Sequence, residues 1–183
     1  MGTIYLFLAT GFEETEAVAA IDVMRRGNLN VRTVSVTGNY LVSGTHDIPV
    51  KADLLFEDAD FTNAAMLVLP GGRLGTENLN AHEALKQLLS DFDRQNRPLA
   101  AICAAPTVLG GLGILNGRKA VCYPGCESKL GKAIYTNAPV VVDGHIITGK
   151  GPAFAIEFGL AIVDFFKGIR TACNISHDLL ILD

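Results

Sequence analysis

The residue with the clearest potential for chemistry in this sequence is Cys103, which lies in the segment LAAICAAP at positions 99–106. An apolar run typical of a buried strand precedes it, and Pro106 suits the first turn of a helix. A side chain at such a strand-to-helix turn is held above the edge of a sheet, and the small residues Ala101 and Ala105 permit the turn, as in the nucleophile elbow of hydrolases. A helix N-terminus also favours the thiolate. The same pattern fits a small, buried, unreactive cysteine equally well.

Glu16 is the second candidate, because its position predicts an unusual environment for a carboxyl group. It precedes Ala20 by four residues and Met24 by eight in a segment with helical spacing, so it shares their apolar face. Burial there favours the neutral acid, which can donate a hydrogen bond to a thiolate or move a proton. The alternative is a carboxylate on the flank of the helix that only supports the helix dipole, as we expect of Glu13 and Glu14.

A glycine-rich loop, PGGRLG, follows a buried strand at positions 70–75. Glycines at such a place let the backbone approach a ligand closely and present amide groups to a developing negative charge. The spacing matches neither a Walker loop nor the dinucleotide-binding fingerprint, so we expect no phosphate cofactor. The alternative is a plain turn.

The remaining cysteines give no sign of a metal site. Cys122 and Cys126 are four residues apart, and no histidine or third cysteine lies near enough in sequence to complete a zinc pattern. We therefore expect two structural thiols there, and no metal in the protein.

The apolar pattern predicts strands that alternate with helices. The expected strands cover residues 4–9, 31–36, 66–69, 98–102, 119–122, 140–142 and 145–148, with a hairpin excursion at 40–61. One helix is expected from a capping box at Thr10 and Glu13 to Gly27, and two more are expected over 82–92 and 152–166. A turn at Asp143–Gly144 is expected to join the last two strands. This alternation predicts an α/β sandwich that binds ligands at the carboxyl ends of its strands.

Composition limits the class of protein. The chain has 183 residues, 49% hydrophobic and 19% charged, which predicts a single domain over positions 1–183. Its net charge is −4 and its 15 Lys and Arg residues are scattered, so we expect no nucleic-acid partner. No apolar run approaches the roughly 20 residues of a membrane span, so we expect no membrane partner. The flanks of the N-terminal apolar run do not suit a signal peptide, which favours a cytoplasmic protein.

Four segments, taken together, resemble the ThiJ/PfpI superfamily: GFEETE at 11–16, LPGG at 69–72, AICA at 101–104 and GPAFAIEF at 151–158. They are most similar to its branch with the parkinsonism-associated deglycase (DJ-one) and bacterial YajL, and they follow one another across nearly the whole chain. The resemblance implies a flavodoxin-like three-layer sandwich with a mostly parallel sheet, of the type found in class I glutamine amidotransferases. It also implies a homodimer.

The resemblance assigns roles to particular residues. It makes Cys103 the reactive cysteine and Glu16 a protonated acid that touches its sulfur. The amide groups of Gly71, Gly72 and Ala104 become the expected donors to an oxyanion.

Three more positions are implied at the rim of the pocket. Tyr123 stands before Pro124, where the branch tends to have a histidine, and its hydroxyl could bind substrate or relay a proton. Arg26 falls at a position that helps to bind anions near an edge of the pocket contributed by the dimer. His46 stands where the human branch has an anion-binding arginine, and is expected to replace it in part.

Membership of this superfamily leaves three functions open. The leading hypothesis is a cofactor-independent enzyme of glyoxalase III or deglycase type, in which Cys103 and Glu16 act on small reactive aldehydes such as methylglyoxal. The second is a redox sensor or stress chaperone without turnover, with Cys103 oxidised to a sulfinic acid. The third is a cysteine peptidase, which is weaker because PfpI-type peptidases have a histidine after the cysteine where this chain has Ala104.

Overall fold

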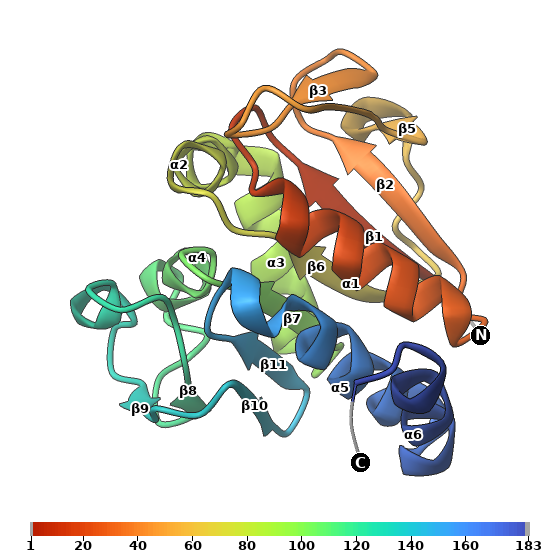
Figure 1. Ribbon diagram of the computed structural model, residues 1–183. Coiled ribbons are helices and arrows are strands. Elements are labelled where there is room, and N and C mark those ends of the chain that lie inside the picture. Colours follow the sequence, from red (N-terminus) through yellow and green to blue (C-terminus); the bar gives the residue numbers. More distant parts are fainter. Residues whose placement is uncertain (1, 182–183) are drawn as a thin grey trace.

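The computed structural model describes residues 2–181, and its centre is a seven-stranded sheet in the order β10, β11, β7, β6, β1, β2, β5 (Figure 1). Neighbouring strands are parallel, except that β10 runs antiparallel to β11 at one edge. The strands are β1 (Thr3–Leu8), β2 (Val31–Ser35), β5 (Leu54–Leu55), β6 (Ala64–Leu69), β7 (Leu99–Ile102), β10 (Val140–Asp143) and β11 (Ile146–Gly149). The predicted flavodoxin-like α/β fold is confirmed.

Strand β1 separates two hydrophobic cores. Successive side chains of a strand point to opposite faces, so Ile4, Leu6 and Leu8 pack in one core, and Tyr5 and Phe7 in the other. None of the five is more than 8% exposed. A strand that is buried on both faces has a continuous apolar sequence, which is why this element could be predicted.

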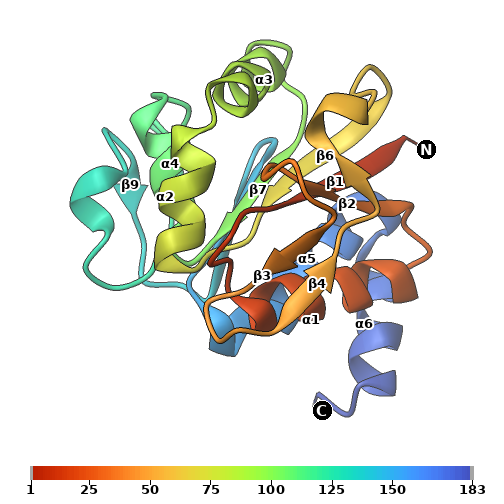
Figure 2. The same cartoon turned by 90° about the horizontal axis from the view of Figure 1, so that it is seen from above.

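Helices cover both faces of the sheet (Figure 2). One face carries α1 (Glu14–Arg26), α5 (Ala155–Lys167) and α6 (Ile169–Asp178), and the other carries α2 (Arg73–Ala81), α3 (Glu83–Arg94) and α4 (Pro106–Gly111). Two small ladders join β3 (Leu41–Ser43) to β4 (Pro49–Lys51) and β8 (Lys119–Ala120) to β9 (Ile134–Tyr135), and 3-10 turns lie at Phe56–Asp58, Glu127–Lys129 and Pro152–Phe154. Within residues 2–181, no helix combines the length and the apolar character needed to cross a membrane.

Two helices, α2 and α6, lie where the sequence pattern predicts none. Each follows a glycine with positive φ, Gly72 at +89° and Gly168 at +82°, and neither has a side-chain N-cap that would mark its start. Each buries only a few residues in the core, among them Leu79 of α2 and Ile175 of α6. Tertiary packing rather than local propensity stabilises them.

The hairpin turn between β10 and β11 is displaced by one residue from its predicted position. The two-residue loop consists of Gly144 and His145, because Asp143 still pairs with Ile146. The Asp143 side chain accepts a hydrogen bond from the backbone N–H of Lys119 at 2.7 Å, which holds it in the strand. A long-range contact therefore decides the register.

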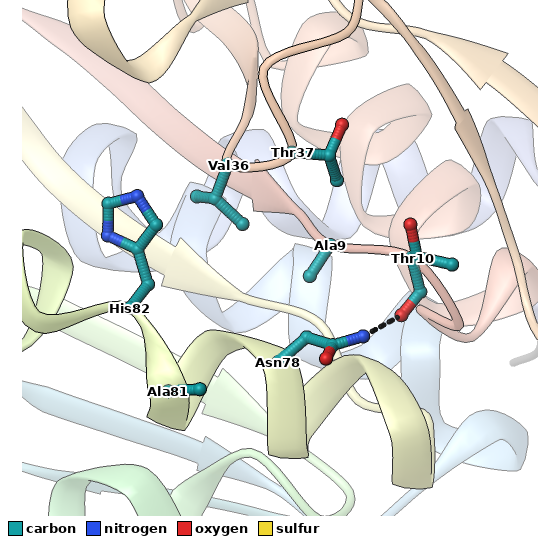
Figure 3. Close-up of a pocket in the computed structure, with 7 residues that line it drawn as sticks. All are labelled: Ala9, Thr10, Val36, Thr37, Asn78, Ala81 and His82. Atoms are coloured by element: carbon teal, nitrogen blue, oxygen red, sulfur yellow. Dashed lines mark hydrogen bonds between the residues drawn. The ribbon is translucent and has the colours of Figure 1, made fainter.

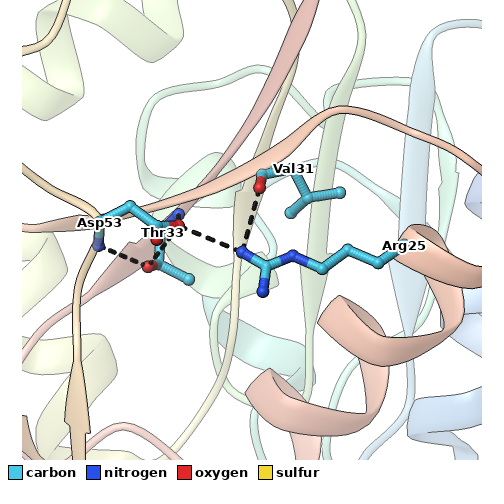
Figure 4. Close-up of polar contacts among 4 residues, drawn as sticks. All are labelled: Arg25, Val31, Thr33 and Asp53. Atoms are coloured by element: carbon cyan, nitrogen blue, oxygen red, sulfur yellow. Dashed lines mark hydrogen bonds and ion pairs between the residues drawn. The ribbon is translucent and has the colours of Figure 1, made fainter.

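The C-terminal end of α1 is tied to the sheet by Asp53 (Figure 4). Its Oδ2 atom accepts hydrogen bonds from the backbone N–H of Thr33 at 2.8 Å and from the guanidinium of Arg25 at 3.2 Å. The same guanidinium donates to the carbonyl of Val31 at 3.2 Å. Because Arg25 belongs to the last turn of α1, these contacts fix the helix against β2, and with it the position of Glu16 in the first turn.

Candidate functional site

Cys103 lies directly after β7 in a backbone conformation that side chains rarely adopt. Its φ angle is +64°, in the left-handed region, which costs a non-glycine residue about 1 kcal/mol or more. Two hydrogen bonds hold this conformation: the N–H of Cys103 donates to the carbonyl of Gly149 at 2.9 Å, and its own carbonyl accepts from the N–H of Tyr123 at 2.7 Å. Strain that is held in place by neighbouring strands is typical of functional positions.

The turn around Cys103 depends on small neighbours. Ala101 and Ala105 are fully buried, so larger side chains have no room there. The chain passes from β7 to the first residue of α4, Pro106, within three residues, and Cys103 itself is 8% exposed. The sulfur is therefore almost enclosed and lies where the sheet ends.

Glu16 lies in the first turn of α1 and is fully buried. Its Oε2 atom accepts a hydrogen bond from the N–H of Gly71 at 2.8 Å, while its Oε1 atom has no hydrogen-bond partner in the part of the chain that the structure describes. The N-cap of this helix is Glu13, which accepts a hydrogen bond from the N–H of Glu16 at 2.7 Å, so the predicted cap at Thr10 is wrong. An acidic side chain can cap as well as a hydroxyl.

Gly71 is the point at which the two candidate residues meet. A Cβ atom on Gly71 would lie 2.5 Å from the Cβ of Cys103 and 2.5 Å from Oε2 of Glu16. These distances are too short for any side chain, so only glycine allows the carboxyl group and the cysteine to approach each other here. Gly71 therefore leaves the space in which Glu16 and Cys103 meet.

The ionisation of the pair is strongly coupled. Burial raises the pKa of Glu16 from its ordinary value of 4.5 to about 7, although the neighbouring Cys103 thiol and the hydrogen bond from the N–H of Gly71 both act to lower that pKa. Burial, together with the charge of Glu16, also raises the pKa of the Cys103 thiol, although the N–H groups of Gly72 and Ala104 act to lower it. The depressed thiol pKa expected from the helix N-terminus is therefore outweighed. Once Glu16 is protonated its charge no longer opposes the thiolate, so the two groups can exchange one proton.

The expected oxyanion donors divide into two groups. The N–H of Gly71 is already engaged by Glu16, so the prediction that this amide faces an oxyanion is wrong. The N–H groups of Gly72 and Ala104 act on the sulfur of Cys103 and are the donors that remain. Gly71 therefore holds the acid, and the amides of Gly72 and Ala104 stay the predicted oxyanion donors.

Two of the expected rim residues, Tyr123 and Arg26, make their hydrogen bonds and ion pairs with groups other than the sulfur of Cys103. Tyr123 is half exposed, and its backbone N–H donates a hydrogen bond to the carbonyl of Cys103. Its ring packs beside Gly151, where a Cβ atom added to the glycine would lie 3.2 Å from the ring. Arg26 lies ten residues beyond Glu16 on α1, about 15 Å along the helix axis, and pairs with Asp22 at 2.7 Å. Within one chain Arg26 is therefore separated from the Cys103 site, and its role in anion binding stays a prediction.

His46 is held beside the first turn of α1 by Glu14. The carboxylate of Glu14 accepts from the backbone N–H of His46 at 2.7 Å and lies 3.0 Å from Nδ1 of its ring. Burial raises the pKa of Glu14, but hydrogen bonds from the backbone and ring of His46 outweigh it and lower that pKa overall. The imidazole is largely exposed, so its other edge is free for solvent or a ligand.

Within residues 2–181, one possible ligand atom from each of Glu13, Glu14 and His46 lies within 4.8 Å of the others, so these residues could offer ligand atoms to a metal. Each has another role, however. Glu13 caps α1, and both oxygens of Glu14 accept hydrogen bonds from His46. Helix capping and an acid–histidine pair account for the cluster.

The contacts that shape the site include residues for which the sequence offers no signal. Gly149 of β11 and Tyr123 hold the backbone of Cys103, yet they are 46 and 20 residues away along the chain. Only the pairing of β7 with β11 brings Gly149 to this place. Local motifs cannot reveal such partners.

Comparisons with known proteins identify the family of this chain. Residues 2–165 match the DJ-1/PfpI family. Parkinson disease protein 7 homolog of Danio rerio is 35% identical over 182 residues, which are 97% of this chain and 96% of the relative. Protein DJ-1 homolog B of Arabidopsis thaliana is 39% identical over 176 residues, which are 95% of this chain but 40% of the relative, so the chain spans less than half of that protein.

Solved structures give the same result. Oxidised Toxoplasma gondii DJ-1 superposes with a TM-score of 0.94 at 32% identity, covering 98% of each chain. Drosophila melanogaster DJ-1beta superposes with a TM-score of 0.94 at 30% identity, covering 100% of this chain and 99% of the other. With the family match over most of its length, the chain belongs to the DJ-1/PfpI family.

Proposed function

We propose that this protein is a cofactor-independent enzyme that acts on small reactive aldehydes such as methylglyoxal. One observation carries the proposal: a fully buried carboxyl group with a pKa near 7 lies beside a nearly enclosed thiol. A group with such a pKa can both take and return a proton at neutral pH, which general acid–base catalysis requires. Cys103 supplies the nucleophile and Glu16 the proton transfer.

The proposed reaction begins with addition. Glu16 takes the thiol proton while the sulfur of Cys103 forms a bond to the aldehyde carbon, and the carbonyl oxygen becomes an oxyanion near the N–H groups of Gly72 and Ala104. The oxyanion is then protonated to a hemithioacetal. Glu16 next moves a proton from the former aldehyde carbon to the neighbouring carbonyl carbon, and the hydroxyl proton of the hemithioacetal passes to the neighbouring oxygen by way of an enediol. The first carbon is thereby oxidised to a thioester carbonyl and the second is reduced to an alcohol. Water hydrolyses the resulting thioester, releasing lactate and the thiol.

The test is to measure methylglyoxal loss and lactate formation together. Lactate distinguishes turnover from simple capture of the aldehyde by thiols. We expect Cys103→Ser and Glu16→Gln each to lower the rate of lactate formation about a hundredfold or more. Cys173→Ser, which changes an exposed thiol on α6, is the matched control and should keep the rate. Equal rates in all four proteins would refute the proposal.

A second function, that of a redox sensor or stress chaperone without turnover, is supported by the same pair. One related solved structure is described as oxidised Toxoplasma gondii DJ-1. In this proposal two equivalents of peroxide convert the Cys103 thiol to a sulfinic acid and release two molecules of water, and Glu16 hydrogen-bonds the product. Mass spectrometry after mild peroxide should place two oxygens on Cys103 before any other cysteine. Oxidation spread evenly over the four free cysteines would refute it.

Assembly and location belong to the same proposal. We infer a homodimer in the cytoplasm, in which Arg26 of one copy approaches the pocket of the other. Light scattering should give twice the chain mass of 19.4 kDa, and cell fractionation should recover the protein with cytoplasmic markers. A monomer in solution would remove Arg26 from the pocket.

A further inference from the structure

A cavity of about 320 Å³ opens at the carboxyl ends of β1 and β2 (Figure 3). Thr10 follows β1, Thr37 follows β2, and Asn78 and His82 come from the end of α2 and the residue after it. None of the residues that line it belongs to the Cys103 site. The carboxyl ends of parallel strands are the usual place for ligands in this class of fold, so the cavity lies where binding is expected.

Asn78 is fixed in the wall of this cavity. Its Nδ2 atom donates a hydrogen bond to the carbonyl of Thr10 at 2.8 Å (Figure 3). That bond sets the direction of the side-chain amide and leaves its Oδ1 atom without a partner in the described part of the chain. The hydroxyl of Thr10 likewise has no protein partner among residues 2–181. The wall therefore offers one positioned acceptor, Oδ1 of Asn78, and one exposed hydroxyl, that of Thr10.

His82 offers the complementary donor. Its Nδ1 atom accepts the N–H of Leu85 at 3.1 Å as the N-cap of α3, so the neutral ring carries its proton on Nε2. Packing against Phe56, with ring centroids 4.5 Å apart, holds the imidazole in place. In Figure 3 the edge of the ring that carries Nε2 lies on the side of Val36. The lining of the cavity thus includes a donor on the ring of His82 and an acceptor on the amide of Asn78, and each side chain is held by one hydrogen bond.

The rest of the lining defines the ligand class. No charged side chain lines the cavity in the described structure, and the N-terminus of α3 is already capped by His82. An anion therefore has no positive group to meet there. The apolar side chains of Ala9, Val36 and Ala81 can pack against the C–H groups of a ligand. A volume at the lower end of the range of ligand pockets limits the size of the ligand.

We propose that this cavity binds a small, uncharged polyhydroxyl compound of triose to pentose size. Nε2 of His82 donates to one hydroxyl oxygen, Oδ1 of Asn78 accepts from another hydroxyl, and the Thr10 hydroxyl can do either. Binding is non-covalent and involves neither Cys103 nor Glu16. The proposal is therefore independent of the proposed function, and the failure of one leaves the other standing.

The test is a titration of the full chain with D-ribose, followed by amide and side-chain NMR shifts. We expect saturable shifts centred on Thr10, Asn78 and His82. Ala81→Phe fills the cavity without removing a hydrogen bond, and should weaken ribose binding about tenfold or more. Asn80→Phe places the same side chain on the neighbouring exposed residue of α2 and should leave binding unchanged.

A second variant separates the ligand contact from the structural role of His82. His82→Asn keeps a side chain that can cap α3 but removes the Nε2 donor, so it should weaken ribose binding while the NMR spectrum stays that of a folded protein. Inorganic phosphate is the anionic comparison, and it should produce no saturable shifts in the cavity. Shifts that do not saturate, that persist in Ala81→Phe, or that phosphate reproduces would overturn the proposal.

Discussion

Glu16 and Cys103 come from segments 87 residues apart in the sequence, and they meet across the vacant side-chain position of Gly71. The N–H of that glycine holds Oε2 of Glu16 at 2.8 Å. The carboxyl group is buried by this arrangement, and its burial raises its pKa to about 7. A single backbone position thus sets both the geometry and the ionisation of the site.

Gly71→Ala tests this relationship directly. The added methyl group would lie 2.5 Å from both neighbours, so we expect a loss of about 1 to 3 kcal/mol in the free energy of unfolding. The rate of Cys103 alkylation should also change. Gly111→Ala is the control, because a Cβ there meets nothing within 4 Å, and urea unfolding should show no loss. Equal stability of the two variants would contradict the close approach.

The raised pKa of Glu16 predicts a particular dependence of stability on pH. The folded state keeps the Glu16 proton up to about pH 7, whereas the unfolded state loses it near 4.5, so this group lowers the free energy of unfolding as pH rises through that window. The full effect above pH 7 is about 3 kcal/mol at most. Glu16→Gln cannot ionise. Its stability relative to the wild type should therefore rise between about pH 5 and about pH 8.

Urea unfolding of both proteins at the two pH values measures this effect. Glu77→Gln changes an exposed carboxylate on α2 and should show no such trend. A difference between Glu16→Gln and the wild type that is the same at both pH values would mean that the carboxyl group ionises normally.

The thiol should respond to what Glu16 can donate. In Glu16→Gln an amide N–H can still donate to the thiolate, whereas in Glu16→Leu no donor is left and the site is more apolar. We therefore expect the pKa of Cys103, measured from the pH dependence of iodoacetamide alkylation, to be higher in Glu16→Leu than in Glu16→Gln. Cys173, labelled in the same sample, provides the internal reference. The reverse order would exclude hydrogen bonding from residue 16 to the sulfur.

The contribution of Glu14 to stability should depend on pH in the opposite direction to that of Glu16. Its pKa is lowered by hydrogen bonds from His46 despite burial, so its ionised form stabilises the fold above about pH 4.5 and this contribution is lost as pH falls. Glu14→Gln should cost about 1 to 2 kcal/mol at neutral pH, and less in acid. His46→Ala keeps the backbone N–H donor and should cost less than Glu14→Gln. Thermal unfolding at two pH values distinguishes these outcomes.

The sequence by itself determined the class of fold and the two residues on which the proposed chemistry depends. Strands buried on both faces, such as β1, have continuous apolar sequences, and the segment around Cys103 combines small residues with a proline in a pattern that marks its turn. The resemblance of four short segments to the family is also a property of the sequence alone. These signals are local, so they can be read without the fold.

Tertiary structure alone decided how those residues interact. The burial of Glu16, the use of the Gly71 amide to hold it and the positive φ of Cys103 all depend on packing between α1, β6, β7 and β11. Desolvation and hydrogen bonding from distant segments set the pKa of a group, and neither is encoded in its immediate neighbours. The same reason explains why α2, α6 and the cavity beside β1 and β2 could not be predicted: each exists only because separate elements pack together.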